Sequence, residues 1–147
     1  MITVLLVDDN GPIRKSLHYL LEVSDDIKLV ATATNGIEGV EKARSHRPDV
    51  AIMDISMPLM DGIEATEHIR ECCGLTRVIM LSGFDEAEYI KRALEVGAKG
   101  YVLKDIAGEE MLEAIRTVSS GKYYFSHQIA EVAEKYIPRK ENDSSVV

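Results

Sequence analysis

In this chain, short apolar runs are followed at once by polar side chains that can take part in phosphoryl chemistry. Asp8 and Asp9 follow the first of these runs, and later runs are followed by Asp54, Ser82 and Lys104. Because the carboxyl ends of parallel strands meet at one edge of an open α/β sheet, these side chains are predicted to share a crevice there. The set comprises three carboxylates, one hydroxyl and one ammonium group.

Three carboxylates in one crevice require cationic partners. At a separation of about 5 Å and an effective dielectric of about 20, each carboxylate pair repels by roughly 3 kcal/mol. Mg²⁺ suits oxygen-only ligands of this kind, and Lys104 supplies a second positive charge. A carboxylate neutralised in this way can act as a nucleophile toward phosphorus. Asp54 is the best candidate by position, since it follows the run expected at the centre of the sheet.

Each of these residues also has an ordinary structural interpretation. An aspartate at a strand end is more often a helix N-cap or part of a turn, and a single lysine or serine is more often solvated or capping. Four strand ends that all supply parts of one phosphoryl site favour the functional interpretation. A phosphatase of the haloacid-dehalogenase type is a remote alternative, because it needs an Asp-x-Asp pattern on the first strand and Asp8 and Asp9 are adjacent.

Five strands alternate with amphipathic helical segments along the chain. The continuous apolar runs are typical of strands that are buried on both faces. They are predicted at residues 2–7, 27–33, 50–53, 78–81 and 101–103. This alternation predicts an α/β fold with a doubly wound (βα)5 parallel sheet of flavodoxin-like strand order 2-1-3-4-5. Helix N-caps are expected at Asn10, Asn35, Asp61 and Asp85.

The pattern changes after Gly121, where the alternation ends. Residues 1–121 are predicted to form one domain, and residues 122–147 a short helix and a linker toward an output domain missing from this chain. The formal net charge is -8, and the whole acidic excess lies in residues 1–121. An acidic balance argues against binding of nucleic acid by this segment itself.

Composition limits the class of protein further. A hydrophobic fraction of 46% with 29% charged residues is typical of a globular protein and excludes collagen-like and disordered classes. No apolar run is long enough to span a bilayer, and carboxylates interrupt the N-terminal run too early for a signal peptide. We therefore expect a cytoplasmic protein with no membrane partner. Cys72 and Cys73 are expected to be reduced thiols.

The chain resembles the receiver domain of bacterial two-component response regulators in four segments: VLLVDDN, VAIMDISMPLMDG, IMLSGFD and GAKGYVLKD. The resemblance covers residues 1–121. It implies a signalling switch, not a conventional enzyme, that receives a phosphoryl group from a sensor histidine kinase. The receiver catalyses only its own phosphorylation and dephosphorylation.

The resemblance also assigns roles to individual residues. It implies that Asp54 is the phosphoacceptor, that Lys104 assists it, and that Asp8 and Asp9 form the acidic pocket. The cofactor implied is Mg²⁺, bound by Asp9, Asp54 and the backbone carbonyl of Ser56.

Four positions are implied to govern the response and its decay. Ser82 takes the place of the switch hydroxyl and Tyr101 that of the aromatic switch residue, which is expected to turn inward on phosphorylation. Ser56 and Phe84 lie where they should modulate dephosphorylation.

The segments YVLKD and SSGKYYFS resemble receivers of the NarL/FixJ, LuxR-type subgroup. This implies regulation of transcription, with DNA bound only through a helix-turn-helix domain that this chain lacks. A standalone receiver that acts through protein contacts or a phosphorelay is the alternative. Homodimerisation on phosphorylation is expected to be possible through the first and fifth helices or the fourth and fifth.

Overall fold

Six parallel strands form a single sheet in the order β2-β1-β3-β4-β5-β6. The structure is a computed structural model that describes residues 1–138, so the predicted linker at residues 139–147 lies outside the described part. The strands are β1 (Ile2–Val7), β2 (Ile27–Ala33), β3 (Val50–Asp54), β4 (Arg77–Ser82), β5 (Gly100–Leu103) and β6 (Tyr124–Phe125). The predicted order of the first five strands is confirmed, and β6 extends it.

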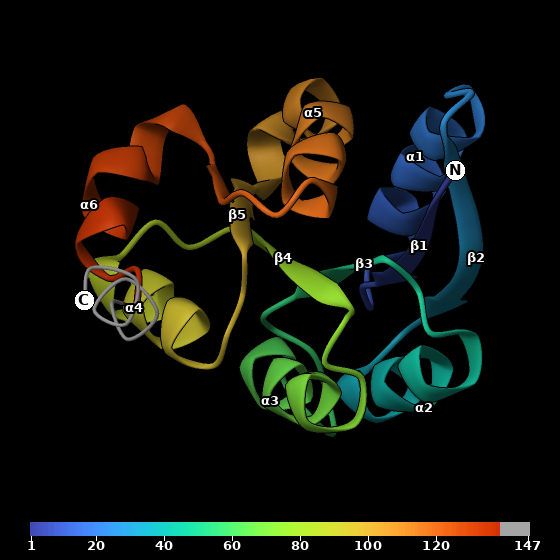
Figure 1. Cartoon of the computed structure of the whole chain (residues 1–147), viewed down its shortest axis with the longest axis horizontal. Helices are drawn as coiled ribbons and strands as arrows, with labels where there is room; N and C mark the ends of the chain where they lie inside the picture. The colour runs from blue at the N-terminus through green and yellow to red at the C-terminus, as the bar shows by residue number, and fades with distance from the viewer. Residues whose placement is uncertain (139–147) are drawn as a thin grey trace, which may run out of the picture.

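Helices cover both faces of the sheet (Figure 1). Helices α1 and α5 lie on one face, and α2, α3 and α4 lie on the other. The helices are α1 (Gly11–Glu22), α2 (Gly36–His46), α3 (Gly62–Cys72), α4 (Ala87–Glu95), α5 (Ala107–Ser119) and α6 (Ala130–Lys135), with 3-10 turns at Lys104–Ile106 and His127–Ile129. The doubly wound architecture predicted from the alternation of elements is therefore confirmed.

The continuous apolar strands supply two hydrophobic cores. Leu5 packs into the core under α2, α3 and α4, whereas its neighbour Leu6 packs into the core under α1 and α5. Successive side chains of a strand point to opposite faces, so a strand covered on both faces must be apolar at every position. Both leucines are fully buried. The carboxyl ends of the strands are held in register by these two layers.

Three of the four predicted N-caps are confirmed. The side chains of Asn10, Asn35 and Asp61 accept hydrogen bonds from backbone N–H groups at the starts of α1, α2 and α3. The expectation for Asp85 was wrong, because α4 begins after Glu86 and has no side-chain cap bond. The preceding loop is instead organised by Ser82, whose Oγ accepts from the backbone N–H of Phe84 at 2.9 Å.

The segment after Gly121 packs against the sheet. Gly121 turns the chain with a φ of 96°, a conformation that favours glycine, and β6 then pairs in parallel with β5. Helix α6 packs against α4 at the same end of the molecule (Figure 1). Residues 122–137, called the C-terminal arm below, thus include the predicted short helix and also a strand that the sequence did not reveal.

Two further features concern expectations from composition. The structure joins Cys72 and Cys73 in a disulfide between adjacent residues, so the expectation of two reduced thiols was wrong. Cys73 is the C-cap residue of α3, and its extended φ of -142° ends the helix there and leaves the two sulfurs side by side. Among residues 1–138, no helix combines the length and the hydrophobicity needed to cross a bilayer.

Candidate functional site

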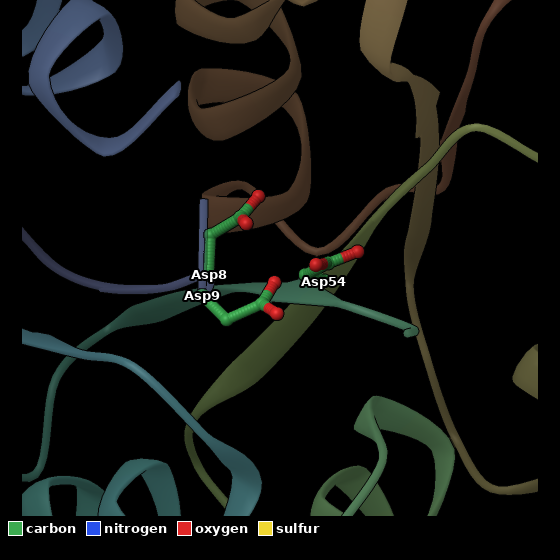
Figure 2. A group of neighbouring side chains, drawn as sticks. All are labelled: Asp8, Asp9 and Asp54. Atoms are coloured by element: carbon green, nitrogen blue, oxygen red, sulfur yellow. The ribbon is translucent and has the colours of Figure 1, made fainter. Parts of the chain in front are cut away.

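The ends of β1 and β3 bring three carboxylates together (Figure 2). Asp8 and Asp9 directly follow β1, and Asp54 is the last residue of β3, which pairs with β1. One carboxylate oxygen of each residue lies within 4.8 Å of the others. Asp8 and Asp54 are almost fully buried, whereas Asp9 is exposed. The sequence prediction that these three side chains share one crevice is thus consistent with their positions.

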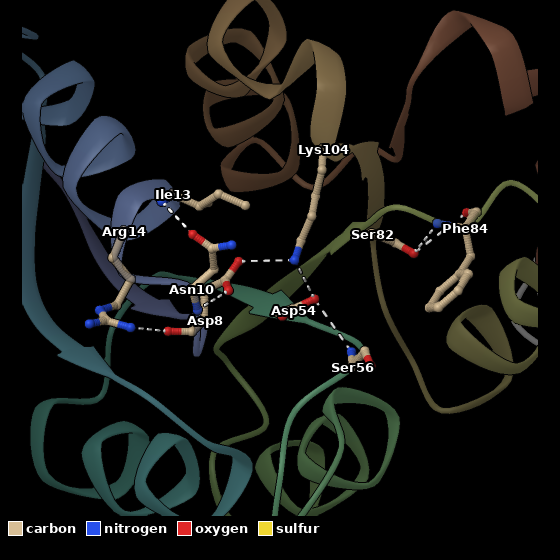
Figure 3. A network of polar contacts seen from close by, with 9 residues as sticks. All are labelled: Asp8, Asn10, Ile13, Arg14, Asp54, Ser56, Ser82, Phe84 and Lys104. Atoms are coloured by element: carbon tan, nitrogen blue, oxygen red, sulfur yellow. Dashed lines mark hydrogen bonds and ion pairs between the residues drawn. The ribbon is translucent and has the colours of Figure 1, made fainter.

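Lys104 joins the carboxylates from the end of β5. Its Nζ lies 3.1 Å from Asp54 Oδ1 and 3.5 Å from Asp8 Oδ2, as Figure 3 shows. The Lys104 side chain is one quarter exposed, so its charge is only partly screened by water. One ammonium group therefore compensates two buried carboxylates, and the cluster retains a negative excess.

The pKa of Asp54 reflects this excess. Burial is the largest cause, and repulsion from Asp8 adds to it, raising the pKa of Asp54 to about 7 against the pull of Lys104. The Ser56 N–H donates to Asp54 Oδ1 at 3.4 Å, a long hydrogen bond. Within the described residues, the buried Oδ2 atoms of Asp8 and Asp54 accept no hydrogen bond, although Asp8 Oδ2 forms an ion pair with Lys104 Nζ at 3.5 Å. Such atoms call for a ligand or a proton.

A hard divalent cation fits this arrangement. Oxygen ligands from two or three carboxylates, one of them open to solvent, suit an ion that keeps several waters. The buried carboxylates of Asp8 and Asp54 lie close to the exposed Asp9 carboxylate, which gives an ion both buried ligands and an approach from solvent. The residues present therefore fit Mg²⁺, and a bound cation would relieve the repulsion that raises the Asp54 pKa.

Local structure holds the two acidic segments in place. Asp8 Oδ1 accepts from the Asn10 N–H at 2.8 Å, and the Asn10 side chain caps α1. The Arg14 guanidinium donates to the Asp8 carbonyl oxygen at 2.6 Å (Figure 3). After β3, the chain returns so closely that a Cβ on Gly62 would collide with the carbonyl oxygen of Asp54. Glycine is therefore required where α3 begins.

The predicted switch residues form a second, connected group. Ser82 ends β4, and its Oγ accepts from Phe84 N–H, while the Tyr101 hydroxyl donates to the Phe84 carbonyl oxygen at 2.7 Å. Burial raises the pKa of Tyr101 to about 12, so its hydroxyl stays protonated and remains a donor. Tyr101 is already fully buried, so the inward turn that we expected on phosphorylation is not needed from this starting position.

The loops around this second group leave space beside the carboxylates. A pocket of about 300 Å³ lies between the β4–α4 and β5–α5 loops. It is lined by Ser82, Gly83, Asp85, Leu103, Lys104 and Asp105. Ser82 and Lys104 thus face the same open space.

Sequence reasoning overlooked two residues that support the site. Arg14 fixes the backbone of the acidic pair, and Ser126 of the C-terminal arm accepts a hydrogen bond from the N–H of Leu103, next to Lys104. Arg14 lies within a helix and Ser126 follows only the two-residue strand β6, which the strand-end pattern did not identify. Their partners lie on other elements and are chosen by packing alone.

Known proteins share both the sequence and the fold. Residues 4–116 match the response regulator receiver domain family. The transcriptional regulatory protein LnrK of Bacillus subtilis (strain 168) is 40% identical over 121 residues, which are 82% of this chain and 55% of LnrK. The oxygen regulatory protein NreC of Staphylococcus epidermidis is 34% identical over 142 residues, which are 95% of this chain and 65% of NreC. The chain thus spans less than two thirds of either relative.

Two solved structures agree with this relationship. A two-component response regulator of the LuxR family from Aurantimonas sp. SI85-9A1 superposes with a TM-score of 0.86 and 31% identity, covering 92% of this chain and 96% of that one. A DNA-binding response regulator of the LuxR family from Staphylococcus aureus gives 0.76 and 28%, covering 81% and 99%. The match over residues 4–116 and these likenesses show that the chain belongs to the response regulator receiver domain family, among the LuxR-type regulators.

Proposed function

We propose that Asp54 accepts a phosphoryl group from a sensor histidine kinase and that this modification switches an output attached after the described residues. LnrK is named as a transcriptional regulator, and the Staphylococcus aureus neighbour as a DNA-binding one. Both relatives in sequence are longer than this chain. These names support regulation of transcription through a DNA-binding output, which we propose to be a helix-turn-helix domain in a cytoplasmic protein.

The position of Asp54 carries the proposal. It is a buried carboxylate at the end of a central strand, 3.1 Å from an ammonium group and beside two further carboxylates. In the transfer, an Asp54 oxygen attacks phosphorus, an oxygen–phosphorus bond forms, and the phosphorus–nitrogen bond to the donor histidine breaks with its electrons on the imidazole. Lys104 neutralises charge on the transferring group.

Mg²⁺ would be held by Asp9, Asp54 and the Ser56 backbone carbonyl, with Asp8 in the acidic pocket beside them. When bound, the ion supplies positive charge to the phosphoryl oxygens and offsets the repulsion among the carboxylates. Asp9 offers the exposed ligand, and Asp54 keeps its Lys104 contact. The role of this chain is to hold the oxygens at a fixed spacing through β1 and β3.

The same geometry supports a route for the response. The Ser82 hydroxyl donates a long hydrogen bond of 3.5 Å to the Phe84 carbonyl oxygen, which also accepts from the Tyr101 hydroxyl, and donation to a phosphoryl oxygen instead would release that carbonyl from Ser82. A change at Asp54 therefore reaches β5 and the β4–α4 loop through three hydrogen-bonded residues. We also propose that Ser56 and Phe84, which are the second residues after Asp54 and Ser82, modulate attack of water on the acyl phosphate.

Intact-mass measurement tests the proposal directly. With acetyl phosphate and Mg²⁺, the native chain should gain one phosphoryl group, and Asp54→Ala should gain none. Asp25→Ala is the matched control, because it removes an exposed carboxylate in the turn before β2, outside the pocket that Ser82 and Lys104 line, and should leave incorporation unchanged. Equal incorporation by the native chain and by Asp54→Ala would overturn the assignment.

A further inference from the structure

The C-terminal arm is attached to the strand that carries the switch residues. Gly100 and Tyr101 of β5 pair with Tyr124 and Phe125 of β6. Beyond β6, Ile129 is 2% exposed and belongs to the same hydrophobic core as Tyr101. The arm is therefore held by backbone pairing and by burial, and both kinds of contact involve β5 or its neighbours.

Ser126 is the polar centre of this attachment. It is fully buried, and its backbone N–H donates to the Tyr101 carbonyl oxygen at 3.0 Å. Its Oγ accepts from the Leu103 N–H at 3.0 Å and donates to Glu110 Oε1 at 2.6 Å. One serine thus joins the arm to β5 and to α5. This buried hydroxyl both accepts and donates a hydrogen bond, so movement of either partner would destabilise the docked arm.

The backbone that Ser126 holds belongs to the phosphoryl site. Leu103 precedes Lys104, whose Nζ contacts Asp54 and Asp8. Tyr101 reaches the Ser82 loop through its hydroxyl bond to Phe84. Lys104 and the Leu103 N–H are adjacent along the backbone, so a backbone adjustment at the end of β5 that follows Lys104 toward new phosphoryl oxygens would also alter the Leu103–Ser126 hydrogen bond.

We propose that Ser126 is a positioning residue that couples the phosphorylation state of Asp54 to the docking of the C-terminal arm. This inference rests on the proposed function. Phosphorylation draws Lys104 away from its present geometry and weakens the Leu103–Ser126 hydrogen bond, so the arm docks less tightly. Because coupling between two sites is reciprocal, loosening the arm strengthens binding of a phosphoryl group or its mimic at Asp54.

Hydrogen exchange of residues 122–137 measures arm docking. In the native chain, acetyl phosphate with Mg²⁺ should make these amides exchange about tenfold faster, the factor expected for loss of one buried hydrogen bond. In Ser126→Ala the same amides should exchange fast with or without acetyl phosphate. Ser120→Ala is the matched control, because Ser120 is exposed and bonds only to the Thr117 carbonyl oxygen of its own helix.

The affinity for beryllofluoride provides a second measurement. If Ser126 had a purely structural role, its removal would not tighten binding of this phosphoryl mimic. With Mg²⁺ present, Ser126→Ala should bind this phosphoryl mimic more tightly than the native chain, and Ser120→Ala should bind it equally. Glu110→Gln keeps an acceptor for the Ser126 hydroxyl and should behave as the native chain. Glu110→Ala removes the acceptor and should behave as Ser126→Ala, which keeps the test available if Ser126→Ala does not fold.

Two failures are distinguishable. Absence of phosphoryl incorporation by the native chain overturns the proposed function. Normal incorporation with unchanged or slower arm exchange overturns the coupling alone. Weaker beryllofluoride binding by Ser126→Ala, or identical behaviour of Glu110→Gln and Glu110→Ala, also overturns it.

Discussion

Asp54 is a buried carboxylate whose surroundings disfavour its charge. Burial and Asp8 raise its pKa, and Lys104 only partly offsets them. A side chain in this state gains from any group that brings positive charge or replaces its negative charge. The site is therefore ready to bind a cation, because the fold maintains a repulsion between carboxylates that a cation relieves.

The raised pKa of Asp54 predicts a pH dependence of stability. The Asp54 carboxyl binds its proton more tightly in the folded protein than in the unfolded chain, where its pKa is 3.8. The free energy of unfolding therefore falls as pH rises from about 4 toward 7. Asp54→Asn removes this charge and should raise the melting temperature at about pH 8 without Mg²⁺, with a smaller gain at about pH 5. Thermal unfolding in a chelator measures both values. Asp85→Asn should show no such trend, and a gain independent of pH would contradict the prediction.

Lys104 is expected to matter for the response more than for metal binding. Lys104→Ala keeps the three carboxylates, whose neighbouring negative charges favour binding of a cation. Calorimetry should therefore still detect Mg²⁺ binding. It should lose the spectral change that phosphorylation causes, because no ammonium group follows the phosphoryl oxygens. Lys28→Ala removes an exposed lysine on β2 and should keep both properties. A full spectral change in Lys104→Ala would show that another residue couples the site.

At the scale of elements, the helix starts and one exposed ion pair fix how the helices meet the sheet. Arg116 of α5 donates two hydrogen bonds to Asp26, which precedes β2, at 2.8 and 3.0 Å. This guanidinium holds the pKa of Asp26 well below its usual range. The contact therefore stabilises the fold above the ordinary pKa of aspartate and is lost as pH falls through the lowered value. It ties α5, which carries Glu110, to the opposite end of the sheet.

The caps give a matched pair of variants at this scale. Asp61 accepts from the Glu64 N–H at 2.8 Å, whereas Asp85 caps no helix. Asp61→Ala should lower the free energy of unfolding by about 1 kcal/mol, the usual value of a cap. Asp85→Ala should change it by less than about 0.5 kcal/mol. Urea unfolding compares them, and equal losses would mean that the start of α4 is capped in solution.

For the whole molecule, the C-terminal arm determines which surfaces are open. It pairs with the edge of β5 and packs on α4. Helix α4 belongs to one of the two faces considered for a dimer in the sequence analysis. A partner that used this face would have to displace the arm. The arm also covers a strand edge whose free N–H and C=O groups would otherwise invite pairing with another chain.

Removal of the arm tests its part in the fold. A chain of residues 1–121 should be less stable than one of residues 1–138 by at least about 2 kcal/mol, because Ile129 leaves the core and the Leu103 N–H loses its partner. Urea unfolding gives the difference, and the shorter chain should associate more readily in sedimentation. Equal stability would show that the arm does not contribute to the stability of the fold.

The five strands, their order, the helices between them and the side chains at the strand ends could all be predicted from the amino-acid pattern. This was possible because burial on both faces demands an apolar residue at every strand position, and a polar residue directly after such a run must lie at the sheet edge. These signals are local, and they predicted the bounds of β1 and β2 to the residue.

Only the tertiary structure decided how the end of the chain is used. β6 is two residues long, too short to show an apolar pattern, and it exists because β5 offers an unpaired edge. Ser126 and Leu103 are 23 residues apart, and nothing near either residue specifies the bond between them. Contacts of this kind depend on the packing of distant elements, so the link between the phosphoryl site and the arm is visible only in the folded molecule.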